Sequence, residues 1–216
     1  MIITLIRQMV YQLKVTFAWL CGASFCIRPG YIHRKNVIAF DDSGNQDEFQ
    51  REVYLFAADF CKEHNITAVL DVGCGSAYKL RKYLFDVVKA GVEPDASNLK
   101  QQFPGETWFE FLDSAWKQFP AQLIICADVI EHVPNPDAFI ADLLAHQHAQ
   151  YFIFSTPDRN LDTSPWKYGP PNNESHYREW TFEEFEKYMS RFFIIEKHEI
   201  SNVEQRTQMI VATRKH

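Results

Sequence analysis

The sequence DVGCG at residues 71–75 constrains the fold of this chain more than any other segment. It follows the apolar run at 68–70 and precedes a helical pattern at 78–84, which predicts a buried parallel strand, a tight glycine turn and a helix. Glycine lets a backbone approach a ligand closely, and the first N–H groups of the following helix point toward that ligand. The segment therefore predicts a loop that binds a nucleotide-like cofactor.

The acid at the start of this loop indicates which cofactor fits. A dinucleotide-binding loop needs a third glycine or alanine where the pyrophosphate meets the helix, and Tyr78 occupies that position here. Asp71 would also lie unfavourably near an anionic pyrophosphate, whereas its carboxylate matches the ammonium group of an amino-acid-bearing cofactor. We therefore expect S-adenosylmethionine rather than NAD.

On these residues the chain resembles the class I S-adenosylmethionine-dependent methyltransferases. The resemblance implies an α/β fold, a Rossmann-like three-layer sandwich whose seven-stranded sheet is mostly parallel with an antiparallel final strand. It also implies an acid after each following strand: Glu93 for the ribose hydroxyls, Asp113 near the adenine amino group and Asp128 after the fourth strand. Asp95 is the alternative to Glu93 if the strand runs further. The third glycine common in the family loop is Ala77 here, which reaches a positive φ less easily. The predicted cofactor-binding residues are Asp71, Gly73, Cys74, Gly75, Glu93, Asp113 and Asp128.

Glu131, His132 and His176 are the predicted catalytic residues. The sequence EHVP at 131–134 is similar to a motif that is common in the family after the fourth strand. A histidine that titrates near neutral pH can accept the proton of a hydroxyl, which favours methyl transfer to oxygen of a small molecule, a sugar or a lipid-linked intermediate. The long aromatic segment 158–180, which contains His176, is typical of a substrate lid.

A divalent cation is an alternative role for the same residues. Two carboxylates and two imidazoles, from Asp128, Glu131, His132 and His176, form a plausible cation site. The pattern is similar to that of small-RNA ribose methyltransferases, which would make RNA the acceptor. Two other interpretations stay open: a purely structural Glu-His pair, and a non-catalytic cofactor-binding scaffold of the same fold.

Two parts are expected in the chain, an amphipathic leader or cap at 1–45 and the methyltransferase domain at 46–216. The almost uncharged run of the leader at 15–27 is too short to span a membrane, and Arg7 and Lys14 interrupt the apolar sequence before it. The leader predicts either a peripheral contact with the inner membrane through residues 1–27 or a helix that covers the core. A cleaved signal peptide is disfavoured because no small-residue cleavage site follows.

Composition limits the partners. The formal charge of −6 and the lack of a Lys/Arg cluster make DNA unexpected and RNA disfavoured. The five cysteines show no paired spacing, which indicates a reduced, cytoplasmic protein.

Some local expectations concern the second half of the chain. A capping box at Thr181 and Glu184 predicts the start of a helix, and strands at 192–198 and 208–213 should pair in antiparallel fashion. His146 and His148 are expected in solvent at a helix end, and Arg178 is expected to form a surface ion pair.

Overall fold

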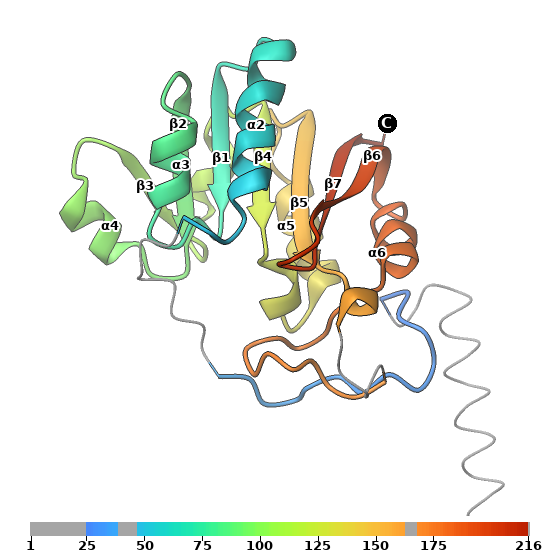
Figure 1. The fold of residues 1–216 in the computed structure, drawn as a ribbon. Coiled ribbons are helices and arrows are strands. Elements are labelled where there is room, and N and C mark those ends of the chain that lie inside the picture. The colour runs from blue at the N-terminus through green and yellow to red at the C-terminus, as the bar shows by residue number, and fades with distance from the viewer. Residues whose placement is uncertain (1–24, 39–46, 163–167, 216) are drawn as a thin grey trace, which may run out of the picture.

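A computed structural model of the protein describes residues 25–38, 47–162 and 168–215 (Figure 1). Its centre is a seven-stranded sheet in the order β3-β2-β1-β4-β5-β7-β6. The strands are β1 (Ala68–Val72), β2 (Val88–Glu93), β3 (Thr107–Glu110), β4 (Leu123–Ala127), β5 (Tyr151–Pro157), β6 (Phe193–Asn202) and β7 (Thr207–Arg214). β1 to β5 pair in parallel, whereas β7 is antiparallel to both β5 and β6. The expected mostly parallel sheet with an antiparallel final strand is confirmed.

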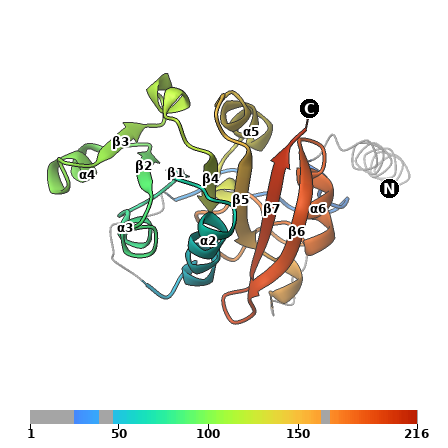
Figure 2. The same cartoon turned by 90° about the horizontal axis from the view of Figure 1, so that it is seen from above.

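Helices cover both faces of the sheet (Figure 2). They are α2 (Arg51–Glu63), α3 (Tyr78–Tyr83), α4 (Ser97–Gln102), α5 (Pro136–Leu144) and α6 (Phe182–Met189), with short 3₁₀ helices η1 (Ser114–Gln118), η2 (Ile130–His132) and η3 (Arg159–Leu161). The capping box is confirmed: the Thr181 hydroxyl accepts from the Glu184 N–H, and the Glu184 carboxylate accepts from the Thr181 N–H. Among the described residues, no helix is long and apolar enough to cross a membrane.

The core has two layers, because successive residues of a strand point to opposite faces of the sheet. In β4, Leu123 and Ile125 pack with α2 and α3, whereas Ile124 and Cys126 pack with α5 and α6. All five residues of β1 and of β4 are buried, as expected of central parallel strands covered on both faces. This double cover explains why both strands are apolar except for Asp71, the fourth residue of β1.

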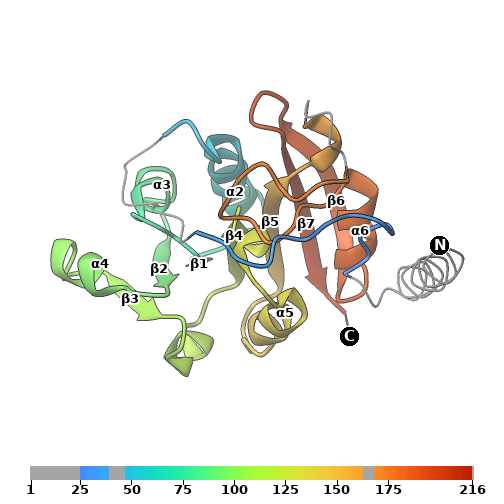
Figure 3. The same ribbon diagram turned by 90° about the horizontal axis from the view of Figure 1, so that it is seen from below.

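Two segments that are distant in sequence meet below the carboxyl ends of the parallel strands (Figures 1 and 3). The N–H of Ile32 donates to the carbonyl oxygen of Tyr168 at 2.9 Å, and that of Arg34 donates to Tyr177 at 2.8 Å. Trp180 fixes the start of the same pairing by donating its indole N–H to the carbonyl oxygen of Phe25 at 2.8 Å. The segment 25–38 therefore lies along the segment 168–180, on the edge of the sheet where the glycine turn ends β1.

The prediction that His146 lies in solvent is wrong. His146 is fully buried; its Nδ1 accepts from the N–H of Ala149 at 3.1 Å, and the Arg214 guanidinium donates to its carbonyl oxygen at 2.7 Å. Helix α5 ends before it, so the chain turns His146 inward beneath β7 instead of continuing along the surface. His148 is exposed, as expected.

Candidate active site

The glycine turn after β1 has the left-handed backbone that its sequence indicates. Gly73 has φ +80° and Gly75 has φ +54°. A Cβ atom on Gly73 would lie 2.3 Å from Cγ2 of Val129, so glycine is required there for space as well as for conformation. Ala77 also adopts a positive φ, of 57°, at the start of α3, which costs an alanine about 1–2 kcal/mol. The family's third glycine is thus replaced by a residue that keeps the same backbone shape.

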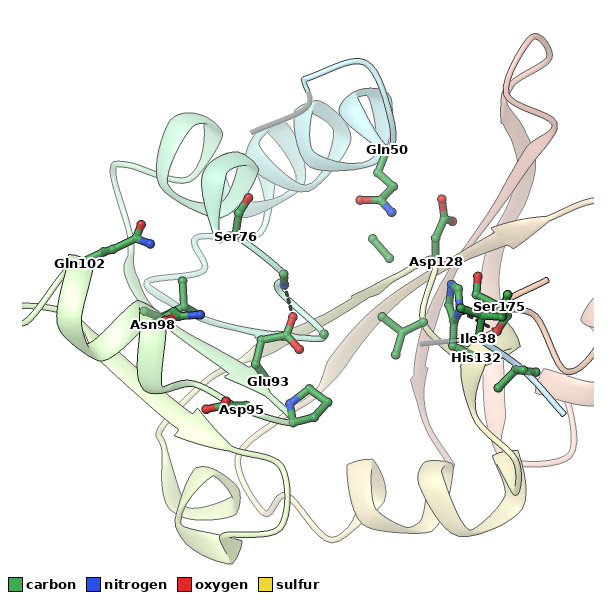
Figure 4. Close-up of a pocket in the computed structure, with 17 residues that line it drawn as sticks. Ile38, Gln50, Ser76, Glu93, Asp95, Asn98, Gln102, Asp128, His132 and Ser175 are labelled. Atoms are coloured by element: carbon green, nitrogen blue, oxygen red, sulfur yellow. Dashed lines mark hydrogen bonds between the residues drawn. The ribbon is translucent and has the colours of Figure 1, made fainter. Parts of the chain in front are cut away.

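A cavity of about 680 Å³ opens beside this turn, at the carboxyl ends of β1, β2 and β4 (Figure 4). Glu93, at the end of β2, projects into it and accepts a hydrogen bond from the backbone N–H of Gly75. Asp128 and His132, which follow β4, line the opposite side. One cavity therefore connects the glycine turn, the acid after β2 and His132, whereas the other two predicted catalytic residues, Glu131 and His176, are buried behind its wall.

A second cavity, of about 350 Å³, adjoins the first and is lined mostly by apolar side chains. The two share Gly73, Pro94, Val129 and His132. Because the Val129 side chain packs against the backbone of Gly73, it stands at the boundary between them.

Three of the predicted cofactor residues lie away from both cavities. Asp71 is fully buried, and its Oδ2 accepts from the Tyr54 hydroxyl at 2.8 Å. Cys74 is buried, with its Sγ packed against Gly91 of β2. Asp113 is exposed and caps η1, accepting from the N–H of Ala115 at 2.9 Å. Of the predicted set, the structure places Gly73, Gly75, Glu93 and Asp128 on the cavity wall.

Asp128 is held in a strained and specific position. Its φ is +53°, and its backbone N–H donates to the carbonyl oxygen of Ser155 at 3.1 Å. The Ser155 hydroxyl donates to its Oδ1 at 2.6 Å. Burial raises the pKa of Asp128, and hydrogen bonds from Ser155 and Gln50 oppose that rise. The residue that follows β4 thus presents its carboxylate to the cavity at the cost of backbone strain.

Glu131, His132 and His176 form a compact cluster beyond Asp128. Each offers one potential ligand atom, and these atoms lie within 4.8 Å of one another. Asp128, the fourth residue of the predicted cation site, is not part of this group. The structure therefore brings together the three predicted catalytic residues from two segments that are more than 40 residues apart in sequence.

Glu131 is an unusual carboxylate. It is fully buried, and its Oε2 accepts from the Thr156 hydroxyl at 3.0 Å. Its Oε1 is also buried and has no hydrogen-bond partner among the described residues. Burial, reinforced by the nearby negative charge of Asp128, raises the pKa of Glu131 well above its usual range. A buried carboxylate oxygen without a donor is a position at which a proton or a cation would be stabilised.

Both imidazoles of the cluster are oriented through Nδ1. His132 donates to the carbonyl oxygen of Ser175 at 3.0 Å, and His176 donates to the Glu179 carboxylate at 2.7 Å. The two rings are nearly perpendicular, with centroids 4.6 Å apart. Burial and the neighbouring His176 lower the pKa of His132 to about 4, so this ring is neutral at pH 7. With Nδ1 protonated, Nε2 carries the lone pair, as in histidines that bind metals.

One carboxylate and two imidazoles fit a first-row divalent cation. The fit rests on the unpartnered Oε1 of Glu131 and on the carboxylate behind His176, because ligating histidines usually donate their other N–H to such a group. Glu179 was not singled out from the sequence, although its position three residues after His176 could have indicated it. Val37 and Ile38, which line the large cavity from the N-terminal segment, carry no motif that could have marked them.

Arg178 does not form the ion pair expected of it. Its Nη1 donates to the carbonyl oxygen of Val133 at 2.6 Å and its Nη2 donates to that of Pro134 at 2.8 Å. Burial lowers the pKa of Arg178 to about 10. The guanidinium thus connects the segment that carries His176 with the residues directly after His132.

A sequence model described as a methyltransferase domain matches residues 42–199 of this chain. The chain belongs to the class I S-adenosylmethionine-dependent methyltransferases. A search of curated proteins found no sequence that matches this chain. S-adenosylmethionine is accordingly its cofactor, as expected from the turn at 71–75, and similar structures include methyltransferases with bound S-adenosylhomocysteine.

Three solved structures illustrate the shared fold. The small RNA methyltransferase HEN1 has a TM-score of 0.59 and 18% identity, over 88% of this chain but 27% of its own length. The methyltransferase domain of bacterial CtHen1-CN has a TM-score of 0.56 and 23% identity, over 77% of this chain and 100% of that domain. The 1,6-didemethyltoxoflavin-N1-methyltransferase of Burkholderia thailandensis has a TM-score of 0.55 and 16% identity, over 76% and 80%. At these identities the similarity concerns the fold, and the acceptors of these proteins differ among themselves.

Proposed function

We propose that this methyltransferase transfers the methyl group to a hydroxyl oxygen of a small acceptor, such as a sugar or a lipid-linked intermediate. The observation that carries the proposal is the single cavity that joins Gly75 and Glu93 to His132. Such a cavity can hold a cofactor at one end and an acceptor hydroxyl at the other. The oxygen-directed part rests on the buried cluster of Glu131, His132 and His176, since a hydroxyl acceptor must lose its proton and this cluster offers a base or a cation site for that step.

The cofactor half uses the residues on the first side of the cavity. Glu93 accepts hydrogen bonds from the ribose hydroxyls, held in place by the N–H of Gly75. The apolar second cavity, next to Pro94 and Val129, suits the adenine ring. Asp71 lies outside the cavity wall and is held by the Tyr54 hydroxyl, so it would act on the cofactor ammonium through its charge and not by contact.

The acceptor half uses the cluster as a cation site. Glu131, His132 and His176 would hold the ion, with Thr156, Ser175 and Glu179 fixing their orientations. When bound, a divalent cation lowers the pKa of an acceptor hydroxyl and orients it. Without a cation, neutral His132, which lines the cavity, would accept the hydroxyl proton instead. Its pKa of about 4 makes it a weaker base than the histidine expected to titrate near neutral pH.

The transfer itself is an in-line displacement. A bond forms between the acceptor oxygen and the methyl carbon while the bond from that carbon to sulfur breaks, and the hydroxyl proton is lost. The products are a methyl ether, S-adenosylhomocysteine and a proton. The chain contributes by positioning: Glu93 fixes the cofactor, and Asp128 and His132 face it across the cavity (Figure 4).

A ribose hydroxyl of RNA is the second candidate acceptor. It is favoured by the Glu131, His132 and His176 cluster together with the fold similarity to the small RNA methyltransferase HEN1. The chain's formal charge of −6 argues against an RNA partner.

Calorimetry of S-adenosylhomocysteine and Mn²⁺ on chelated protein tests the site, and mass spectrometry of acceptor panels tests the reaction. The panels contain monosaccharides, nucleosides, lipid-linked sugars and small RNAs with and without a terminal 2′-hydroxyl. We expect Mn²⁺ binding that Glu131→Gln and His176→Ala abolish and that His148→Ala, at an exposed histidine, leaves unchanged. Methylation of RNA alone would favour the second candidate. Cofactor binding without turnover of any acceptor would support the interpretation of the chain as a non-catalytic cofactor-binding scaffold.

A further inference from the structure

Charge is divided unevenly along this chain. All 28 acidic residues lie beyond residue 40, whereas five of the 22 Lys and Arg lie within the first 40 residues. The first 40 residues therefore carry +5 and the remainder −11. The five cations are Arg7, Lys14, Arg28, Arg34 and Lys35. Such an asymmetry indicates an anionic partner for the N-terminal part, even though the whole chain is acidic.

The described part of this cationic region, residues 25–38, crosses the mouth of the active site. Figure 3 shows it running across the carboxyl ends of the strands. Backbone hydrogen bonds to Tyr168, Glu174 and Tyr177 fix it there. Its last two residues, Val37 and Ile38, line the large cavity itself. Whatever binds this segment therefore lies next to the entrance used by an acceptor.

The outer side of the segment combines aliphatic and cationic side chains. Ile32 and Ile38 are 58% and 61% exposed, and Tyr168, whose carbonyl accepts from Ile32, is 55% exposed. Lys35 is exposed on the same segment, and so is Arg28, whose Nε also lies 3.5 Å from the Glu184 carboxylate. Apolar side chains next to cations are typical of a surface that inserts into the interface of an anionic membrane. Phosphate groups of a nucleic acid would use the cations but leave the aliphatic side chains in water.

We infer that residues 25–38, together with Tyr168, form a docking surface for a membrane that contains anionic phospholipid. Docking in this orientation turns the cavity mouth toward the bilayer, so that a lipid-linked hydroxyl can reach the site. The choice of acceptor rests on the proposed function, whereas the docking itself does not. Residues 1–24, which contain Arg7 and Lys14, lie outside the described residues.

The test is co-sedimentation of the full chain with vesicles of phosphatidylcholine alone and of phosphatidylcholine mixed with phosphatidylglycerol. The wild-type chain should bind the mixed vesicles and lose that binding at high salt. Each cation near an anionic surface strengthens binding roughly fivefold, so Lys35→Glu should weaken it by about 25-fold. Ile32→Ser should weaken binding to the mixed vesicles at low salt, because it removes an exposed aliphatic side chain from the surface. Glu174→Gln, which removes an exposed carboxylate beside Ile38, should strengthen it roughly fivefold.

Matched controls lie near the amino ends of the parallel strands, away from residues 25–38. Lys62, 68% exposed on α2, and Phe85, 69% exposed before β2, are changed in Lys62→Glu and Phe85→Ser. Both variants should bind vesicles as the wild type does. Equal losses in Lys35→Glu and Lys62→Glu would overturn the inference, because net charge alone would then explain binding. Displacement of the chain from vesicles by single-stranded RNA at matched phosphate concentration would also overturn it.

Failure of docking can be separated from failure of the proposed function. Lys35→Glu should keep its S-adenosylhomocysteine affinity and its methylation of a water-soluble acceptor, because Lys35 lies outside both cavities. If Lys35→Glu does not fold, Lys35→Gln should weaken vesicle binding roughly fivefold. Unchanged vesicle binding by folded Lys35 variants would overturn the inference and leave the proposed function intact.

Discussion

His176 donates its Nδ1–H to the carboxylate of Glu179 at 2.7 Å, and both side chains are buried. The N–H of Glu179 in turn donates to the Tyr31 hydroxyl at 3.3 Å. A histidine from the segment 168–180 is thus oriented by an acid that the N-terminal segment supports. The N-terminal segment 25–38 is thus connected, through Glu179, to the position of the His176 ring.

Changing Glu179→Gln should weaken cation binding about 10- to 100-fold, because the His176 ring would lose the carboxylate that fixes its orientation. Titration of chelated protein with Mn²⁺ measures the effect, and S-adenosylhomocysteine affinity should stay unchanged. The control is Glu183→Gln, at an exposed acid four residues further along. Identical Mn²⁺ affinities for the two variants would show that Glu179 does not act on the cluster.

The variant Glu93→Gln should bind S-adenosylhomocysteine about tenfold more weakly, since hydrogen bonds from ribose hydroxyls to a carboxylate are stronger than those to an amide. Calorimetry measures this directly. Glu110 is the partner of Glu93 in the β2–β3 register and pairs with Lys100 on the surface, so Glu110→Gln is the matched control and should have no effect. A normal affinity for Glu93→Gln would remove this residue from the cofactor site.

For Gly73→Ala we expect loss of cofactor binding together with lower stability. The new Cβ would lie 2.3 Å from Val129, and an alanine at φ +80° costs about 1–2 kcal/mol. Gly30→Ala separates the two causes, because Gly30 has φ +90° and no heavy atom within 4 Å of an added Cβ. It should show only the conformational cost in urea unfolding.

The double variant with Gly73→Ala and Val129→Ala should then recover part of the cofactor affinity, because it removes the Cγ atoms that meet the new Cβ. If recovery fails while the double variant is folded, the close contact with Val129 is not the cause of the loss.

The stability of the cation-free protein should depend on pH through Glu131. Its folded pKa is raised, so its contribution to stability is fully present below its unfolded pKa of about 4.5 and is lost as pH rises through the folded value. Glu131→Gln should therefore be more stable than the wild type at pH 8 and should lose this pH dependence. Urea unfolding of chelated protein at pH 5 and pH 8 measures both effects. A wild-type protein that becomes more stable from pH 5 to pH 8 relative to the variant would contradict the prediction.

The sequence predicted the local elements well where each is encoded by consecutive residues. The apolar runs of β1 and β4 and the capping box of α6 confirm this, because strands buried on both faces and helix caps depend on nearby residue types. His146 was misplaced because the polarity of one residue does not reveal that the chain turns inward after α5. Arg178 was misassigned because its partners are backbone carbonyl oxygens, which every residue has and no motif marks.

The sequence by itself therefore determined the family, the sheet and the cofactor, since these follow from hydrophobic patterning and from a glycine turn whose geometry is local. Only the tertiary structure decided which acids face the cavity: Glu93 and Asp128 do, whereas Asp71 and Asp113 do not. It also separated Asp128 from the cluster of Glu131 and its two histidines. The physical reason is that the burial of a side chain, its hydrogen-bond partners and the shift of its pKa depend on other segments, which it meets only when the chain folds.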